Sequence, residues 1–298
     1  MKALITGVTG YLGSRLAARL AGNCEVYGLV RQPLKTTYLP QEVLGGLTLL
    51  SYDGSGESLL AALEISQPDI VFHLAAHYTG AHDLAAVSAL TVSNLYLGNC
   101  LLEAMQLSGK CRKIVYATSY YAHISGKAYH PLNLYAATKK AFSDIVEFYT
   151  DAGYVEAASV MLSDTYGSDD QRPKVLNLIR QAILEKRSMD LTSGRQIFDL
   201  LYVDDVVDGL IQAAKALENP PAAHQFFQLN SENPLSLRET VELMLKVNHL
   251  KFEANWGGRP EPERQIYKPA KVYPPPPGWA QRVSLEKGLK RFWTEPGL

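Results

Sequence analysis

Residues 2–13 read KALITGVTGYLG and set the architecture expected for the whole chain. Residues 2–6 form a short strand-like run, and the amphipathic segment from Tyr11 to Ala21 predicts a helix just after it. Gly7, Gly10 and Gly13 lie in the turn between them. Glycine permits a tight turn and a close approach of the backbone to an anion, and the N-terminus of a helix offers free N–H groups. We therefore expect a phosphate-binding turn beside a parallel sheet.

The alternation of strand-like and helical segments continues beyond this turn. Strand-like runs occupy residues 25–30, 47–52, 69–76, 113–118 and 155–162, and helical segments lie near residue 58 and over 83–107 and 135–150. Six or seven strands in one doubly wound parallel sheet is the simplest assembly, so an α/β fold of the Rossmann type is expected.

The two halves of the chain differ in composition. Residues 1–162 are expected to form a dinucleotide-binding domain. Prolines and polar turns are more frequent over residues 163–298, which predicts a smaller, discontinuous lobe that mainly binds the substrate. Within it, residues 196–217 look like a strand and a helix that pack back on the main sheet.

Composition argues against several kinds of partner. Lysine and arginine number 29 against 30 aspartates and glutamates, so no overall positive field attracts nucleic acid or an anionic membrane. The three cysteines lack metal-like spacing and predict free thiols. No secretory pattern and no apolar run of roughly twenty residues is found, so a soluble cytoplasmic protein is expected. His73, His77 and His82 have no carboxylate or cysteine to complete a ligand set, and no metal site is expected.

The second strand carries the signal for the type of dinucleotide. An NAD enzyme usually places a carboxylate at the end of this strand for the ribose 2′-hydroxyl, but the sequence here is VYGLVRQ, with Arg31 and no acid. A cation there favours the additional phosphate of NADP. We therefore expect NADP(H), with NAD left open.

Tyr135 and Lys139 form a YxxxK pair that is predicted to lie on one face of a helix. A second pair, Tyr267 and Lys271, shows that such spacing also arises by chance. Only the first pair opens a helix after a predicted strand and follows a candidate hydroxyl partner, Ser119.

Several landmarks occur together and in order: GVTGYLG, PDIVFHLAA, Asn94 ahead of LLEA, IVYATS, Tyr135 with Lys139, DTYG, YVDDVVD and PGW. With these, the chain resembles the extended short-chain dehydrogenase/reductase family of nucleotide-sugar epimerases, dehydratases and ketoreductases. The resemblance covers nearly the whole chain and implies a Rossmann fold, a nicotinamide dinucleotide and a nucleotide-diphosphate sugar.

The resemblance also implies roles for residues at matching positions. Tyr135 would exchange a proton with the substrate, Lys139 would lower the pKa of Tyr135 and hold the nicotinamide ribose, and Ser119 would bind the same substrate oxygen, with Thr118 as its nearest competitor. Asn94 would support the lysine, and Asp53 would contact the adenine. The other cofactor contacts would come from Gly7, Thr9, Gly10, Tyr11, Leu12, Gly13, Leu74, Ala75, Ala76 and Leu162.

The type of reaction that a family member catalyses depends largely on the two residues after the catalytic hydroxyl, here Tyr120 and Tyr121. Dehydratases carry an acid there and 3,5-epimerase/reductases a cysteine nearby; this chain has neither. What remains is reduction of a keto sugar or 4-epimerisation, and Arg31 favours an NADPH-dependent ketoreductase. The segments around DTYG and NWGGRP look similar to members that reduce 4-keto-6-deoxy or 4-keto-3,6-dideoxy nucleotide sugars. Substrate contacts are expected from Tyr120, Tyr121, His123, Asp164, Arg172, Arg195 and Arg259.

Two departures from the family pattern put pyrophosphate contacts in doubt: Asp164 stands where asparagine is common, and Phe198 where arginine is common. A non-catalytic dinucleotide sensor or scaffold is the alternative outside enzymology, but such relatives have lost the active-site tyrosine or lysine, and this chain keeps both. The family often forms homodimers through two long helices, here near residues 90–107 and 135–150, and a homodimer is expected.

Overall fold

The computed structural model describes residues 1–32, 34, 38–218 and 222–295. Its centre is a seven-stranded, entirely parallel sheet in the order β11-β6-β5-β4-β1-β2-β3. In chain order these strands are β1 (Lys2–Thr6), β2 (Glu25–Arg31), β3 (Leu47–Tyr52), β4 (Ile70–His73), β5 (Lys113–Ser119), β6 (Glu156–Leu162) and β11 (His224–Leu229). The sheet confirms the doubly wound α/β fold.

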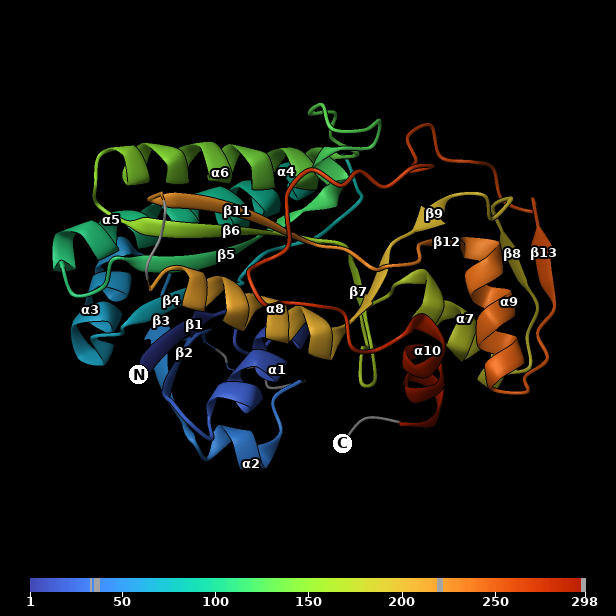
Figure 1. Ribbon diagram of the computed structural model, residues 1–298, viewed down its shortest axis with the longest axis horizontal. Coiled ribbons are helices and arrows are strands. Elements are labelled where there is room, and N and C mark those ends of the chain that lie inside the picture. The colour runs from blue at the N-terminus through green and yellow to red at the C-terminus, as the bar shows by residue number, and fades with distance from the viewer. Residues whose placement is uncertain (33, 35–37, 219–221, 296–298) are drawn as a thin grey trace.

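Helices cover both faces of this sheet (Figure 1). On one face, α3 (Gly56–Ser66), α5 (Leu97–Ser108) and α6 (Leu134–Asp151) bury a core that includes Leu63, Leu101 and Phe142. On the other face, α1 (Tyr11–Leu20) and α8 (Val203–Ala216) bury a second core that includes Leu16 and Leu210. A short helix, α2 (Gln41–Leu44), precedes β3.

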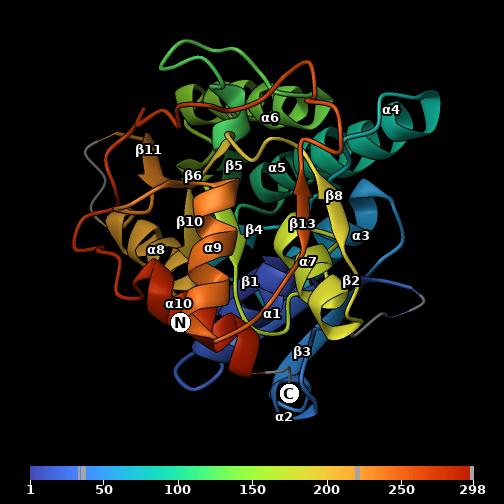
Figure 2. The same ribbon diagram turned by 90° about the vertical axis from the view of Figure 1, so that its right-hand side faces the viewer.

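The elements after β6, apart from α8 and β11, form a smaller lobe at the carboxyl end of the sheet, which faces the viewer in Figure 2. It contains three helices, α7 (Val175–Leu184), α9 (Leu237–Val247) and α10 (Leu285–Thr294). Its strands form three short pairs among the described residues. They are β7 (Asp164–Tyr166) with β10 (Leu200–Tyr202), β8 (Met189–Leu191) with β13 (Ala254–Trp256), and β9 (Ile197–Phe198) with β12 (Leu235–Ser236).

The chain crosses between the two parts more than once. Helix α8 returns from the smaller lobe to contact α1 and β6. Strand β11, which the sequence division left within 163–298, pairs with β6 over six residues and completes the main sheet. Its sequence HQFFQL mixes polar and apolar residues, as an edge strand with one partner allows.

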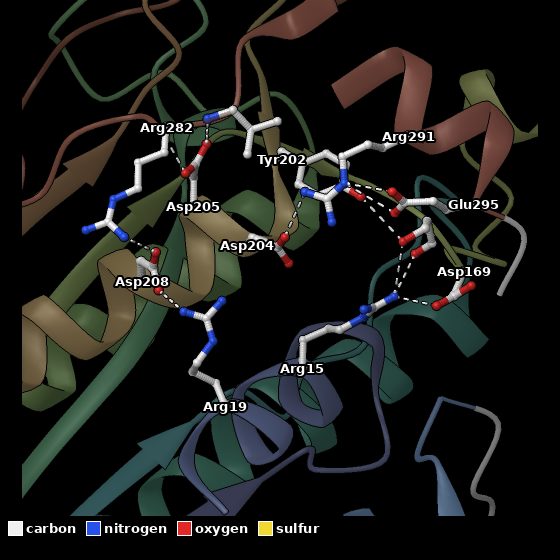
Figure 3. Close-up of polar contacts among 12 residues, drawn as sticks. Arg15, Arg19, Asp169, Tyr202, Asp204, Asp205, Asp208, Arg282, Arg291 and Glu295 are labelled. Carbon is white, nitrogen blue, oxygen red and sulfur yellow. Dashed lines mark hydrogen bonds and ion pairs between the residues drawn. The ribbon is translucent and has the colours of Figure 1, made fainter. Parts of the chain in front are cut away.

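Charged side chains join the two parts around α1 (Figure 3). Arg15 binds Asp169 at 2.5 Å and Arg19 binds Asp208 on α8. On α10, Arg291 binds Asp204 at 3.1 Å. Helix α1 is therefore attached both to the loop that follows β7 and to α8, so the dinucleotide half and the substrate half share one framework.

One apolar helical segment runs from Leu84 to Ser108 through α4 (Leu84–Thr91), a π-helical turn (Val92–Tyr96) and α5. By length and composition this segment is able to cross a membrane. An 18-residue stretch within it has a mean hydropathy of 1.4, and 28% of that stretch is buried. The expectation that no apolar run reaches this length was therefore wrong. Length and composition alone do not distinguish a membrane span from a helix packed on a sheet. Here Gly98 lets the segment approach α6 closely, because a Cβ at Gly98 would lie 2.3 Å from the Phe142 ring.

Candidate active site

A groove of about 1640 Å³, its open mouth included, lies at the carboxyl ends of β1, β2, β3 and β4. This is the end at which parallel α/β sheets bind ligands. Its lining includes many of the expected cofactor contacts, namely Gly7, Thr9, Gly10, Arg31, Asp53, Leu74, Ala75 and Ala76. Among the other expected contacts, the hydroxyl of Tyr11 donates to Ser168 O at 2.8 Å, and Leu12 and Leu162 pack against the core instead.

The glycine turn has the geometry that the sequence predicted. Gly7 has a φ of +72°, and a Cβ there would lie 2.7 Å from Ala75 N. A Cβ at Gly13 would lie 2.1 Å from Gly7 O, so the turn and the helix meet at backbone distance. Gly10 begins α1 without any side-chain cap. The first N–H groups of α1 are therefore available to an anion in the groove.

Two charged side chains stand at the rim of the groove. Arg31 ends β2, is exposed, and lines both the main groove and a hollow beside it. Asp53 follows β3, and its carboxylate accepts hydrogen bonds from Ser55 N at 2.9 Å and Ser55 Oγ at 2.7 Å. These bonds hold the pKa of Asp53 below its usual value.

Ser119, Tyr135 and Lys139 come from two adjacent elements. Ser119 ends β5, and helix α6 is preceded by its N-cap Asn133, whose side chain accepts a hydrogen bond from Ala136 N at 3.0 Å. This cap fixes the start of the helix, so that Tyr135 lies in its first turn and Lys139 one turn later. The second YxxxK pair, Tyr267 and Lys271, is not on a helix.

Burial governs the protonation of both residues of the pair. Lys139 is 3% exposed, and burial lowers its pKa to about 8. Burial also raises the pKa of Tyr135 to about 12, with Tyr78 adding to the rise and Arg172 opposing it. Lys139 is not among the groups that shift the pKa of Tyr135, so the expected lowering of this pKa by Lys139 is not found.

Asn94 lies in the π-helical turn and is 1% exposed. Its Oδ1 accepts from His77 N at 2.8 Å, and its Nδ2 donates to His77 O at 3.0 Å and Thr138 Oγ1 at 3.0 Å. The side chain thus ties the loop after β4 to the residue beside Lys139, rather than to Lys139 itself. Thr118 is placed differently from Ser119: its hydroxyl lies 3.5 Å from Ser159 Oγ on β6.

Tyr120 and Tyr121 turn towards Asp164. Tyr120 donates to Asp164 Oδ2 at 2.5 Å and Tyr121 to Asp164 Oδ1 at 3.0 Å. Burial and the neighbouring carboxylate hold the pKa of both phenols well above their usual value. His123 is 8% exposed and its Nδ1 lies 3.1 Å from Ala128 O. The structure thus brings Tyr120, Tyr121 and Asp164 together and leaves His123 supporting its own loop.

The three expected substrate arginines lie apart. Arg172 is bound in a bidentate manner to Asp170, with both N–O distances 2.6 Å, and stacks over the Tyr11 ring. It is therefore engaged within its own loop rather than free for a diphosphate. Arg195 and the exposed Arg259 lie away from Arg172, on two neighbouring loops of the smaller lobe, and the backbone of each loop adjoins β8. Arg195 Nε lies 3.1 Å from Ser193 Oγ.

Two further residues were missed from the sequence. Tyr78, on the loop after β4, meets the Tyr135 ring edge to face at 5.0 Å between centroids. Lys174 lies in a cavity with Asp164 and Asp170, and burial lowers its pKa to about 8. No local signal marks either residue, because each acquires its role from segments distant in sequence.

Among the residues that the structure describes, no group of His, Cys, Asp and Glu side chains is arranged to hold a metal ion. The groove and the uncapped helix N-terminus together fit a dinucleotide, and Tyr135 and Lys139 would contact its nicotinamide end.

Comparisons with known proteins agree with this fold. The CDP-abequose synthase of Salmonella muenchen is 23% identical over 98% of this chain and 96% of its own length. The UDP-glucose 4-epimerase of Thermotoga maritima, solved with UDP-glucose, superposes with a TM-score of 0.84 at 19% identity, covering 98% of this chain and 97% of its own. The UDP-glucuronic acid 4-epimerase of Bacillus cereus, solved with UDP-glucuronic acid and NAD, gives a TM-score of 0.80 at 19% identity over 98% of both chains.

The pattern of one family spans most of the sequence, matching residues 3–226 under the description "NAD dependent epimerase/dehydratase family". This range contains the glycine turn, most of the main sheet and every residue of the expected catalytic group. The chain therefore belongs to the NAD-dependent epimerase/dehydratase family and is an NAD(P)-dependent enzyme of the extended short-chain dehydrogenase/reductase type.

Proposed function

We propose that this protein catalyses the NADPH-dependent reduction of a 4-keto-deoxy or 4-keto-dideoxy nucleotide-diphosphate sugar. The observation that carries the proposal is the position of Arg31, an exposed cation at the rim of the dinucleotide groove where an NAD enzyme needs a carboxylate. The relatives named CDP-abequose synthase support a nucleotide-sugar reductase rather than an enzyme acting on free sugars.

The catalytic residues suit the reductive direction. When bound, NADPH supplies the hydride. Tyr135 donates the proton that the reduced oxygen requires, and a phenol with a pKa of about 12 carries that proton at neutral pH. Ser119 donates a second hydrogen bond to the same oxygen and stabilises its developing charge. Lys139, one turn along α6, holds the nicotinamide ribose.

NAD-dependent 4-epimerisation of a nucleotide sugar is the second candidate. It is favoured by the structural neighbours, several of which are 4-epimerases solved with NAD. An epimerase retains its cofactor through the cycle and has no need to distinguish NADP from NAD. Cofactor preference therefore separates the two candidates.

Calorimetric titration of the purified protein with NADPH and with NADH tests the proposal. We expect NADPH to bind about tenfold more tightly or better, since a charge-assisted hydrogen bond to the 2′-phosphate contributes about 1.5 to 3 kcal/mol. Arg31→Asp is expected to abolish this preference, and Lys110→Asp, the same charge change at an exposed site after α5, to preserve it. Equal affinities in the wild type, or NAD(H) that remains bound through purification, would favour the epimerase.

We also propose that the protein is a cytoplasmic homodimer. Its cysteines, Cys24, Cys100 and Cys111, are free thiols, as a reducing compartment permits. Large apolar side chains are exposed along the Leu84–Ser108 segment and on α6, including Leu84 at 89% and Phe148 at 61%. A second copy of the chain would cover these faces.

A further inference from the structure

Tyrosine side chains and one carboxylate form a continuous wall beside Tyr135. The Tyr78 ring lies 5.0 Å from the Tyr135 ring and 6.4 Å from the Tyr121 ring, measured between centroids. The Tyr121 hydroxyl donates to Asp164 at 3.0 Å, and the Tyr120 hydroxyl donates to the same carboxylate at 2.5 Å. We refer to Tyr78, Tyr120, Tyr121 and Asp164 as the tyrosine–aspartate cluster.

We infer that this cluster makes the enzyme select neutral sugars and exclude sugars that carry a carboxylate, such as uronic acids. The inference rests on the proposed function, because it takes a nucleotide sugar as the substrate. A pyranose whose keto oxygen accepts a hydrogen bond from Tyr135 must place neighbouring ring substituents against the neighbours of Tyr135. On this side of Tyr135 those neighbours are Tyr78 and Tyr121, with the charge of Asp164 directly behind Tyr121.

The rings and the carboxylate act on different parts of a sugar. Aromatic rings pack well against C–H groups, whereas a hydroxyl pressed against them loses water without gaining a partner. Deoxygenated positions are therefore favoured over hydroxylated ones at this wall. A carboxylate on the sugar would meet the like charge of Asp164 in a partly desolvated site, where such repulsion is strong.

The cations that face Asp164 are already engaged. Lys174 lies in the same cavity as Asp164, but its Nζ donates to the carbonyl oxygen of Thr165 at 2.9 Å. Arg172 is held by both oxygens of Asp170. Both cations therefore have partners of their own, and the Asp164 carboxylate is the charged group bound directly to Tyr120 and Tyr121.

Calorimetric titration of the NADPH-loaded protein at pH 7 with UDP, UDP-glucose and UDP-glucuronate tests this inference. The nucleotide is the same in all three ligands, so its own affinity cancels from the ratio of the two sugar affinities. We expect UDP-glucuronate to bind the wild type about tenfold or more weakly than UDP-glucose. Asp164→Asn keeps the shape, with its amide oxygen accepting from one tyrosine and its amide nitrogen donating to the hydroxyl oxygen of the other, and it is expected to reduce this ratio to about twofold or less.

A matched variant separates the local charge from the net charge. Asp190→Asn removes a carboxylate from β8, where it accepts a hydrogen bond from Asn255, and it is expected to leave the ratio unchanged. The inference is overturned if the wild type binds both sugars equally, or if Asp164→Asn leaves the ratio as it was. If neither these three ligands nor their CDP counterparts bind, the nucleotide-sugar proposal itself fails, and the inference fails with it.

Discussion

Replacing Lys139 by methionine should stabilise the folded protein while removing its activity. The lysine is 3% exposed and makes no hydrogen bond with any residue that the structure describes. Burial lowers its pKa from 10.5 to about 8. At about 1.4 kcal/mol per pH unit, this difference means that burial of the ammonium group destabilises the folded protein by about 3 kcal/mol. Methionine has a similar length and carries no charge, so the cost disappears.

The lowered pKa of Lys139 determines how the stabilisation by Lys139→Met changes with pH. Between about pH 8 and 10.5 the unfolded chain retains the Lys139 proton while the folded chain has released it, so the unfolded state binds more protons and stability rises with pH. Below pH 8 the full cost is present. The advantage of Lys139→Met should therefore be about 3 kcal/mol at pH 7 and should shrink towards zero by pH 10.5. Lys174 titrates in the same range, but it is present in both proteins and cancels from the comparison.

Urea unfolding of the protein without cofactor, at pH 7 and at pH 10.5, measures this difference. Lys140→Met is the control, because Lys140 is its neighbour on α6 but is 41% exposed and paired with Asp144. That variant should change the unfolding free energy by about 0.5 kcal/mol or less. If Lys139→Met is no more stable than the wild type at pH 7, or if its advantage is the same at both pH values, the reasoning from burial is wrong.

Two other predictions concern catalysis and assembly. Tyr135→Phe should lower kcat by a factor of roughly 10² to 10⁴ and leave the affinity for NADPH nearly unchanged. Tyr267→Phe, from the second YxxxK pair, should leave kcat unchanged. Steady-state kinetics and calorimetry check both variants, and unchanged turnover in Tyr135→Phe would rule out Tyr135 as the proton donor. Leu84→Glu should convert the proposed dimer to a monomer in sedimentation experiments, and it should still fold because Leu84 is 89% exposed in the single chain. Ile65→Glu, at an exposed site on α3, should leave the dimer intact. A wild-type protein that is already monomeric would contradict the dimer proposal.

The parts of the fold that the sequence predicted are those determined by local chemistry. The glycine turn was predictable because Gly7 and Gly13 are required by contacts within a few residues of the first strand, apart from one approach to Ala75. The pairing of Tyr135 with Lys139 was predictable because helical spacing alone places them on one face. The strand-like runs of the first half were equally clear, since buried parallel strands are continuously apolar.

The parts that were missed depend on contacts between distant segments. Strand β11 was not foreseen, because an edge strand of mixed polarity has a weak pattern. The π-helical turn at Asn94 depends on packing around the residue rather than on its neighbours in sequence. The raised pKa of Tyr135 and the position of Tyr78 follow from how a loop folds over the site, which no spacing of residues encodes. The bidentate pairing of Arg172 with Asp170, two residues before it, was also not foreseen.

The strand order of the main sheet also bears on how the protein is made. β1, the first strand of this sheet to be synthesised, lies inside the sheet, and β2 and β3 extend it on one side before β4, β5 and β6 extend it on the other. Each strand of this series except β4 pairs with the one synthesised just before it, and β4 pairs with β1, so growth needs few long-range searches. Only β11 must wait until more than two hundred residues have been synthesised. Until then β6 is an unpaired edge strand of the nascent chain. The nascent chain is therefore most prone to aggregate with other chains during this interval.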